Sequence, residues 1–197
     1  MPIAGLALLP ILLGAPLVLT PVLIALLEMI IDPTCSIALE AEHGETDVMR
    51  RPPRPREQRI LNLRLFTRSL LQGLLALALV GVVFVWARSR HLPPDAVRAV
   101  SFAAIVCCVI GLLLVNRSFA STLQRQNRPR SNLTLVVLLA AIVLVIGTLI
   151  SVPMSQHFLQ IAPLTGWQLM LALSAGATLV LVVELIKGWR RSLRPPA

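Results

Sequence analysis

Two acidic side chains, Glu28 and Asp32, stand in an otherwise apolar stretch of the sequence. Their spacing of four residues places both carboxylates on one face of a helix, with Cβ atoms about 5–6 Å apart. At the centre of a membrane each isolated acid is unfavourable by about 2.5–3.5 kcal/mol, so a pair at that depth indicates a neutralising cation or proton. The chemistry that this pair predicts is reversible binding of a positive ion.

A proline lies directly after the acid pair. Pro33 has no N–H, so the carbonyl oxygen of Met29 loses its usual helical donor. We expect a break in the helix that exposes this oxygen between the carboxylates of Glu28 and Asp32, an arrangement that coordinates hard cations. These three groups are the predicted cation ligands. The alternative is a helix-packing pair with one or both acids protonated, because burial disfavours the charged form.

The composition indicates that the pair belongs to a membrane protein. Of the 197 residues 56% are hydrophobic and 14% are charged, and the mean hydropathy is +0.82. So few charged side chains cannot cover a soluble surface, which excludes a water-soluble enzyme. The net charge of +9 does not indicate a nucleic-acid partner, because only 4% of the residues are aromatic.

Long charge-free runs locate the membrane spans, since a helix needs about 20 residues to cross about 30 Å of hydrocarbon. We predict an all-α polytopic transmembrane helix bundle that forms a single membrane domain over 1–197. The expected elements are a short helix at 2–14 and five full spans at 17–40, 66–87, 99–117, 132–153 and 166–187. The segment 2–14 is too short to span, so we expect it to be the end of a helix that starts upstream. A signal peptide is the less favoured interpretation, because no Lys or Arg precedes the apolar run.

The distribution of basic residues predicts the orientation. Of the 18 Lys and Arg, fifteen fall in the loops after the second and fourth predicted segments and in the C-terminal tail. The other loops hold three. Because basic loops stay in the cytoplasm, we expect a multi-pass protein of the cell (inner) membrane with a cytoplasmic C-terminus. Trp86, Trp167 and Trp189 fall at span ends, where aromatic rings meet the lipid headgroups.

Other polar residues have simpler interpretations. Cys107 and Cys108 point about 100° apart on a helix, which favours packing over soft-metal binding. Glu184 and Lys187 form an i,i+3 pair at the interface, with a role in regulation or docking as the alternative. The arginine-rich loop 50–59 serves topology, and binding of anionic lipid is the alternative.

The residues around the acid pair resemble a known family. The run Leu26–Ile37, followed by Asp47–Arg54, resembles the sixth transmembrane helix and the next cytoplasmic loop of P-type cation-transporting ATPases. The similarity is closest to bacterial members of the calcium, sodium and proton pump branch. Those proteins carry an acid-rich motif in that helix and then a loop reading Met-x-Arg-Pro-Pro-Arg. Residues 164–167 and 184–187 resemble the start and end of the tenth helix.

The resemblance implies that this chain is the membrane portion of such a pump, from the end of the fifth helix through the tenth. Asp32 matches the family's cation-ligating aspartate, and Glu28 matches the position one turn earlier. Some calcium pumps have a further carboxylate in the eighth helix, about where Val109 stands here, so the cation is left open among Ca, Na, H or another ion.

The sequence has no Asp-Lys-Thr-Gly phosphorylation motif and no glycine-rich nucleotide loop. We therefore expect that this chain does not hydrolyse ATP by itself and holds no cofactor besides the transported cation. The resemblance implies that Mg-ATP binds to an N-terminal ATPase segment or to a separate catalytic chain. Loop 50–59 would then lie against the phosphorylation domain. A self-standing small cation channel or carrier, and an inactive remnant, are the alternative interpretations.

Overall fold

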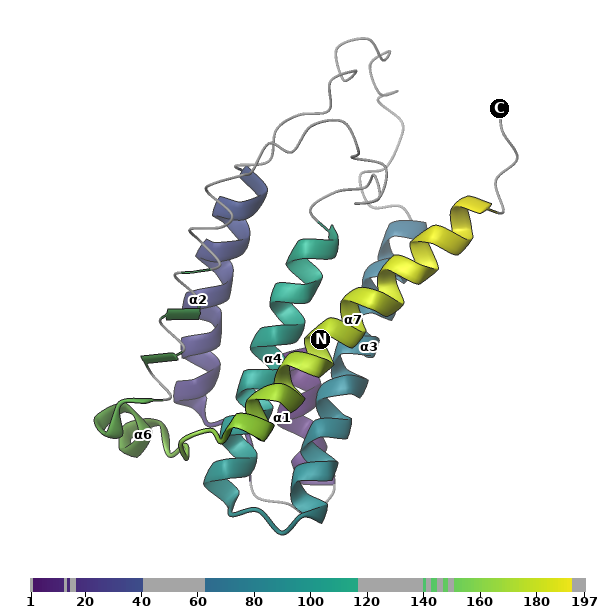
Figure 1. The fold of residues 1–197 in the computed structure, drawn as a ribbon. Helices are drawn as coiled ribbons and strands as arrows, with labels where there is room; N and C mark the ends of the chain where they lie inside the picture. Colours follow the sequence, from purple (N-terminus) through teal and green to yellow (C-terminus); the bar gives the residue numbers. More distant parts are fainter. Residues whose placement is uncertain are drawn as a thin grey trace.

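The computed structural model describes residues 2–12, 14, 17–40, 63–116, 140, 143–144, 147–148 and 151–192. Within these residues the regular structure is entirely helical (Figure 1), which confirms the predicted fold class for this part of the chain. The helices are α1 (Pro2–Leu12), α2 (Pro21–Glu40), α3 (Leu63–Ser89), α4 (Pro94–Asn116), α6 (Pro153–Leu159) and α7 (Gly166–Ser192).

Prolines begin several of these helices. Pro21, Pro94 and Pro153 are the first residues of α2, α4 and α6, where the missing N–H leaves no hydrogen bond unmade and the fixed φ angle favours the helix. Two of the helices, α3 and α6, are followed by a residue in the left-handed conformation. His91 follows α3 with φ 54°, and Gln160 caps α6 with the same φ. These two residues turn the chain at one end of the bundle.

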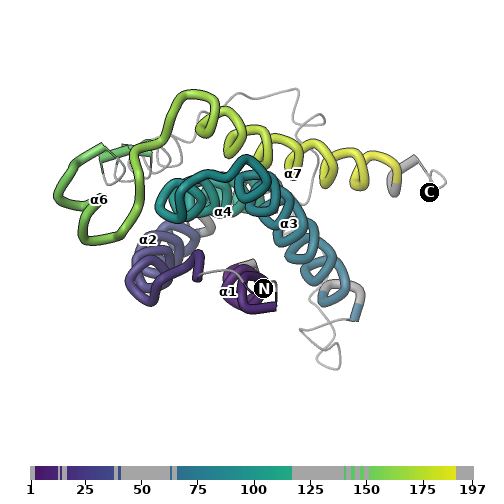
Figure 2. The backbone as a smooth tube through the Cα atoms, turned by 90° about the horizontal axis from the view of Figure 1, so that it is seen from below, coloured from purple at the N-terminus to yellow at the C-terminus, as the bar shows by residue number. Residues whose placement is uncertain are grey.

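Helix α4 is the centre of the bundle. Viewed along the helices, it lies between α7 on one side and α1 and α2 on the other, with α3 beside it (Figure 2). It packs most extensively on α7, then on α3, and least on α2. The buried side chains of α4 extend from its first turn to its last, including Val97, Phe102, Ile105 and Val115. The core therefore runs along α4, because this helix is covered on several sides.

Two glycines allow α4 and α7 to approach closely. A Cβ atom added at Gly176 on α7 would lie 2.8 Å from the carbonyl oxygen of Cys107 on α4. A Cβ atom added at Gly111 on α4 would lie 3.2 Å from the carbonyl oxygen of Gly176 and 3.1 Å from Val180. Backbone therefore faces backbone at this crossing, the arrangement that small residues permit between membrane helices.

The predicted count of five spans is not confirmed. In the described part of the chain, three helices are long and apolar enough to cross a membrane: Phe66–Ser89, Pro94–Asn116 and Gly166–Trp189. Helix α2, which carries the acid pair, is not one of these three. Most of the predicted span 132–153 lies outside the described residues, and α6 follows it where the sequence predicted a loop.

The crossing of α4 and α7 yields a prediction. We expect Gly176→Ala to lower the free energy of unfolding by about 1–3 kcal/mol, because the new methyl group meets the rigid backbone at Cys107. The matched control is Gly188→Ala on the same helix, where a Cβ atom meets nothing within 4 Å. We expect Gly188→Ala to raise the free energy of unfolding by about 0.5–1 kcal/mol, because alanine favours a helix more than glycine does. Denaturation of the purified chain in mixed detergent micelles measures both, and equal effects of the two variants would contradict the close crossing.

Candidate functional site

The acid pair lies on the face of α2 that is turned away from α4. Leu23 and Leu27 are fully buried and Thr34 is 8% exposed, which defines the packed face of the helix. Glu28 and Asp32 are both exposed. Because successive residues rotate by about 100°, this pattern puts the carboxylates on the far side from the packed face. The structure therefore presents both predicted acidic ligands together, on a surface that the other described residues leave exposed.

The predicted break at Pro33 is wrong, because α2 continues through this residue to Glu40. In the same turn the hydroxyl group of Thr34 donates a hydrogen bond to the carbonyl oxygen of Ile30, which supplements the backbone bonding of the helix. Pro33 still cannot donate to the carbonyl oxygen of Met29. The carbonyl oxygen of Met29 is thus expected to lie within a continuous helix and not at a break in it.

A small cavity lies between α2 and α4, on the side opposite to the acids. Its volume is about 20 Å³, and its lining is mostly apolar, with Leu27, Thr34 and Cys35 from α2 and Val106 and Leu113 from α4. Neither predicted carboxylate is among the residues around it. This cavity fits a water molecule at most and lacks the oxygen ligands that a hard cation needs.

The acid pair offers only part of a coordination shell. Among the described residues, no group of three or more His, Cys, Asp or Glu side chains gathers where it could hold a metal ion. A calcium ion takes six to eight oxygen ligands, and a proton needs only one carboxylate. Tight binding of a metal cation at Glu28 and Asp32 would therefore need oxygen ligands besides these two carboxylates.

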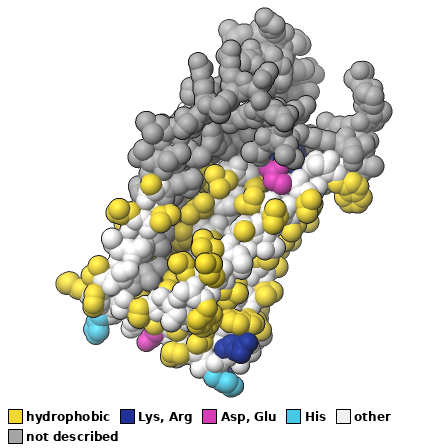
Figure 3. Space-filling view, in the orientation of Figure 1, with side chains coloured by type: hydrophobic (Ala, Val, Ile, Leu, Met, Phe, Trp, Pro, Cys, Tyr) yellow, Lys and Arg dark blue, Asp and Glu magenta, His cyan; other side chains and the backbone are white. Residues whose placement is uncertain are grey.

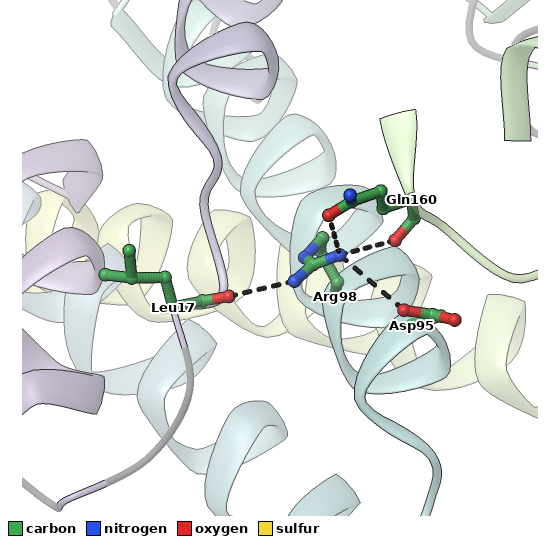
Figure 4. Close-up of polar contacts among 4 residues, drawn as sticks. All are labelled: Leu17, Asp95, Arg98 and Gln160. Atoms are coloured by element: carbon green, nitrogen blue, oxygen red, sulfur yellow. Dashed lines mark hydrogen bonds and ion pairs between the residues drawn. The ribbon is translucent and has the colours of Figure 1, made fainter. Parts of the chain in front are cut away.

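Arg98 joins three separate segments at the opposite end of the bundle (Figure 4). One guanidinium nitrogen donates to the carbonyl oxygen of Gln160 at 2.7 Å and lies 3.3 Å from its side-chain oxygen. The other nitrogen donates to the carbonyl oxygen of Leu17 at 3.3 Å. Asp95 lies 3.6 Å away on the same helix, and its carbonyl oxygen accepts from the N–H of Ala162. The Arg98 side chain itself is only 11% exposed, whereas the Asp95 side chain is 61% exposed.

The Arg98 contacts include the segment that leads into α2. Leu17 precedes the first residue of α2, Pro21, by one helical turn, so the guanidinium holds the entry to the helix that carries the acids. In the sequence Arg98 is one of the three basic residues outside the predicted cytoplasmic loops and tail. Its i,i+3 spacing from Asp95 was the available signal, but the distant partners Leu17 and Gln160 could not be inferred without the fold.

Lys187 makes a second contact between helices. It lies 3.5 Å from Glu184, as the i,i+3 spacing predicted. However, its side chain is only 12% exposed, and its ammonium group donates to the carbonyl oxygen of Val115 in the last turn of α4. Carbonyl groups at a helix C-terminus lack helical partners and carry partial negative charge, so a cation there is stabilising. Lys187 thus fixes α7 against the end of α4 rather than extending to the surface.

Two tryptophans meet at the other end of these helices. The rings of Trp86 on α3 and Trp167 on α7 have centroids 5.3 Å apart in an edge-to-face arrangement at 68°. The guanidinium of Arg90 lies 5.2 Å from the Trp86 ring, within range of a cation–π interaction. Tryptophans with this partly polar setting are typical of the membrane–water interface.

Comparison with protein families matches residues 16–189 to the family described as "Cation transporting ATPase, C-terminus". The chain belongs to this family. It is the membrane part of a cation-transporting ATPase, and the matched region includes α2 with both acids, α3, α4 and nearly all of α7. Comparison with curated proteins gives no match.

The Arg98 contacts yield a prediction for this ATPase membrane domain. We expect Arg98→Gln to lower the free energy of unfolding by about 2–3 kcal/mol, because charge-assisted hydrogen bonds to Leu17 and Gln160 are lost. Amide hydrogen exchange at 17–20 and 160–165 should accelerate. Arg98→Lys should recover only part of the protection from hydrogen exchange. An ammonium group lacks the planar fork of donors with which the guanidinium binds both partners. Arg90→Gln is the control, and equal acceleration in that variant would contradict the role assigned to Arg98.

Proposed function

We propose that this chain supplies part of the cation pathway of a pump in the bacterial calcium, sodium and proton branch of P-type ATPases. The observation that carries the proposal is the acid pair on α2 inside the region matched to the family. Glu28 and Asp32 would bind the transported cation, with the Met29 carbonyl as an additional oxygen ligand. Asp32 would take the role of the family's cation-ligating aspartate.

The exposed position of both acids supports a shared site. Carboxylates facing hydrocarbon are unfavourable, so another protein segment must cover this face of α2 in the working pump. That segment would complete the coordination shell and exclude lipid. We propose that it belongs to the N-terminal ATPase portion, either in the same polypeptide or in a separate catalytic chain, which also binds Mg-ATP.

The helix ends support the proposed orientation. In Figure 1 the C-terminal ends of α2, α4 and α7 and the start of α3 lie at one end of the bundle. The fifteen basic residues in the predicted cytoplasmic loops and tail follow α2 or α4 in the sequence, lie in the first turns of α3, or lie in the last turns of α7 and just after it. This end would face the cytoplasm of a cell whose inner membrane holds the protein. The catalytic segment, with its phosphorylated aspartate, would then act on the two acids from the cytoplasmic side of the membrane.

Substitution of the acids tests the proposed site. In the chain reconstituted with its catalytic segment, we expect Glu28→Gln and Asp32→Asn each to weaken binding of the transported cation at least tenfold, because a charged ligand is replaced by a neutral one. The probes are ⁴⁵Ca²⁺, ²²Na⁺ and the pH dependence of phosphorylation. Glu40→Gln, at the end of the same helix, should leave binding unchanged. Unaltered transport in both site variants would refute the assignment.

The second candidate is a self-standing carrier that uses the same acids without ATP. Its supporting observation is the same acid pair on α2, which would load a cation without a phosphorylated partner. Liposomes containing only the 197-residue chain separate the two candidates. We expect no cation flux without the catalytic segment, because that segment would complete the shell around the two acids that the described residues leave exposed. Flux that Asp32→Asn abolishes would favour the carrier.

A further inference from the structure

A cleft opens at the end of the bundle where α3 turns into α4. Its volume is about 340 Å³, at the lower end of the range of small-molecule sites. The floor is apolar and includes Val18, Phe84 and Val97, each at most 7% exposed. The segment between α1 and α2 contributes one wall, and the α3–α4 turn contributes the other.

The rim of this cleft is basic. Arg88, in the last turn of α3, and His91, in the turn itself, both line it and are both exposed. A basic and a histidine side chain are seen together at this end of the molecule (Figure 3). Among the described residues around the cleft there is no Asp or Glu. The nearby Asp95 is turned toward Arg98 instead (Figure 4).

The depth of the cleft in the membrane follows from its neighbours. Trp86, in the same last turn of α3 as Arg88, pairs with Trp167 at the start of α7. Such rings lie at the level of the lipid headgroups. The basic rim is therefore at the height of lipid phosphates, and the apolar floor is at the height where the acyl chains begin.

We propose that this cleft binds an anionic phospholipid of the adjacent leaflet. Its phosphate would lie between Arg88 and His91, with a charge-assisted hydrogen bond from the Arg88 guanidinium and a hydrogen bond from the His91 ring. The first methylene groups of an acyl chain would cover the floor around Leu17 and Phe84. A bound lipid would pack against the segment before α2 and the α3–α4 turn together. The proposal depends on the chain lying in a membrane, and it is independent of the cation site.

Native mass spectrometry of the purified 197-residue chain in detergent tests the proposal. We expect phosphatidylglycerol to bind at least tenfold more tightly than phosphatidylcholine with the same acyl chains. The double variant R88Q/H91Q should lose this preference, with the two lipids binding within about twofold of each other. The matched control R90Q/H157Q removes the same kinds of side chain outside the cleft and should keep the preference.

Three outcomes would overturn the proposal. An equal loss of preference in both double variants would mean that only overall charge attracts the lipid. If the unaltered chain bound phosphatidylcholine as tightly as phosphatidylglycerol, the rim would not select the headgroup. Binding of glycerol phosphate as tight as that of the whole lipid would indicate a site for a free anion. If R88Q/H91Q does not fold, Leu17→Glu is the substitute variant, because it places an acid at the exposed wall of the cleft. This variant should lose the preference for phosphatidylglycerol. If it keeps the preference, the site is refuted.

Discussion

Two carboxylates one helical turn apart in an apolar helix must be neutralised or covered wherever that helix meets hydrocarbon. This constraint governs the interpretation of α2. The packed face of α2 lies against α4, whereas Glu28 and Asp32 lie on the opposite face and are exposed. Under the proposed function the chain would hold one half of the cation site, and the catalytic segment would supply the other half. A bound cation would then compensate for the charges of the two acids.

The rest of the bundle positions this half-site. The α4–α7 crossing is tight, because backbone meets backbone at Gly111 and Gly176. Lys187 adds a contact from α7 to the last turn of α4. Helix α2 has far fewer contacts with α4 and lies next to a small cavity, so a movement of α2 disrupts less packing than a movement of α7. Arg98 restrains the entry to α2 and leaves its acid face free.

The sequence predicted the helices better than it predicted their contacts. The predicted spans 66–87 and 166–187 fall within α3 and α7, because long charge-free runs indicate membrane helices directly. The seven-residue helix α6 was missed, since its turn-like composition gives no periodic signal. The break at Pro33 was wrongly expected, because proline removes one hydrogen bond and the helix nevertheless continues through it to Glu40. The Arg98 contacts connect residues up to 81 positions apart, a distance that no local pattern reveals.

Labelling of membrane carboxyl groups with dicyclohexylcarbodiimide tests the central claim most directly. This reagent modifies acids that face an apolar phase, and mass spectrometry identifies the modified residues. In the isolated chain in lipid vesicles, Glu28 and Asp32 should both be labelled, and added cation should not protect them. With the catalytic segment present, the transported cation should protect both. Failure of both acids to react in the isolated chain, or full reactivity in the cation-loaded pump, would contradict a shared cation site on this face of α2.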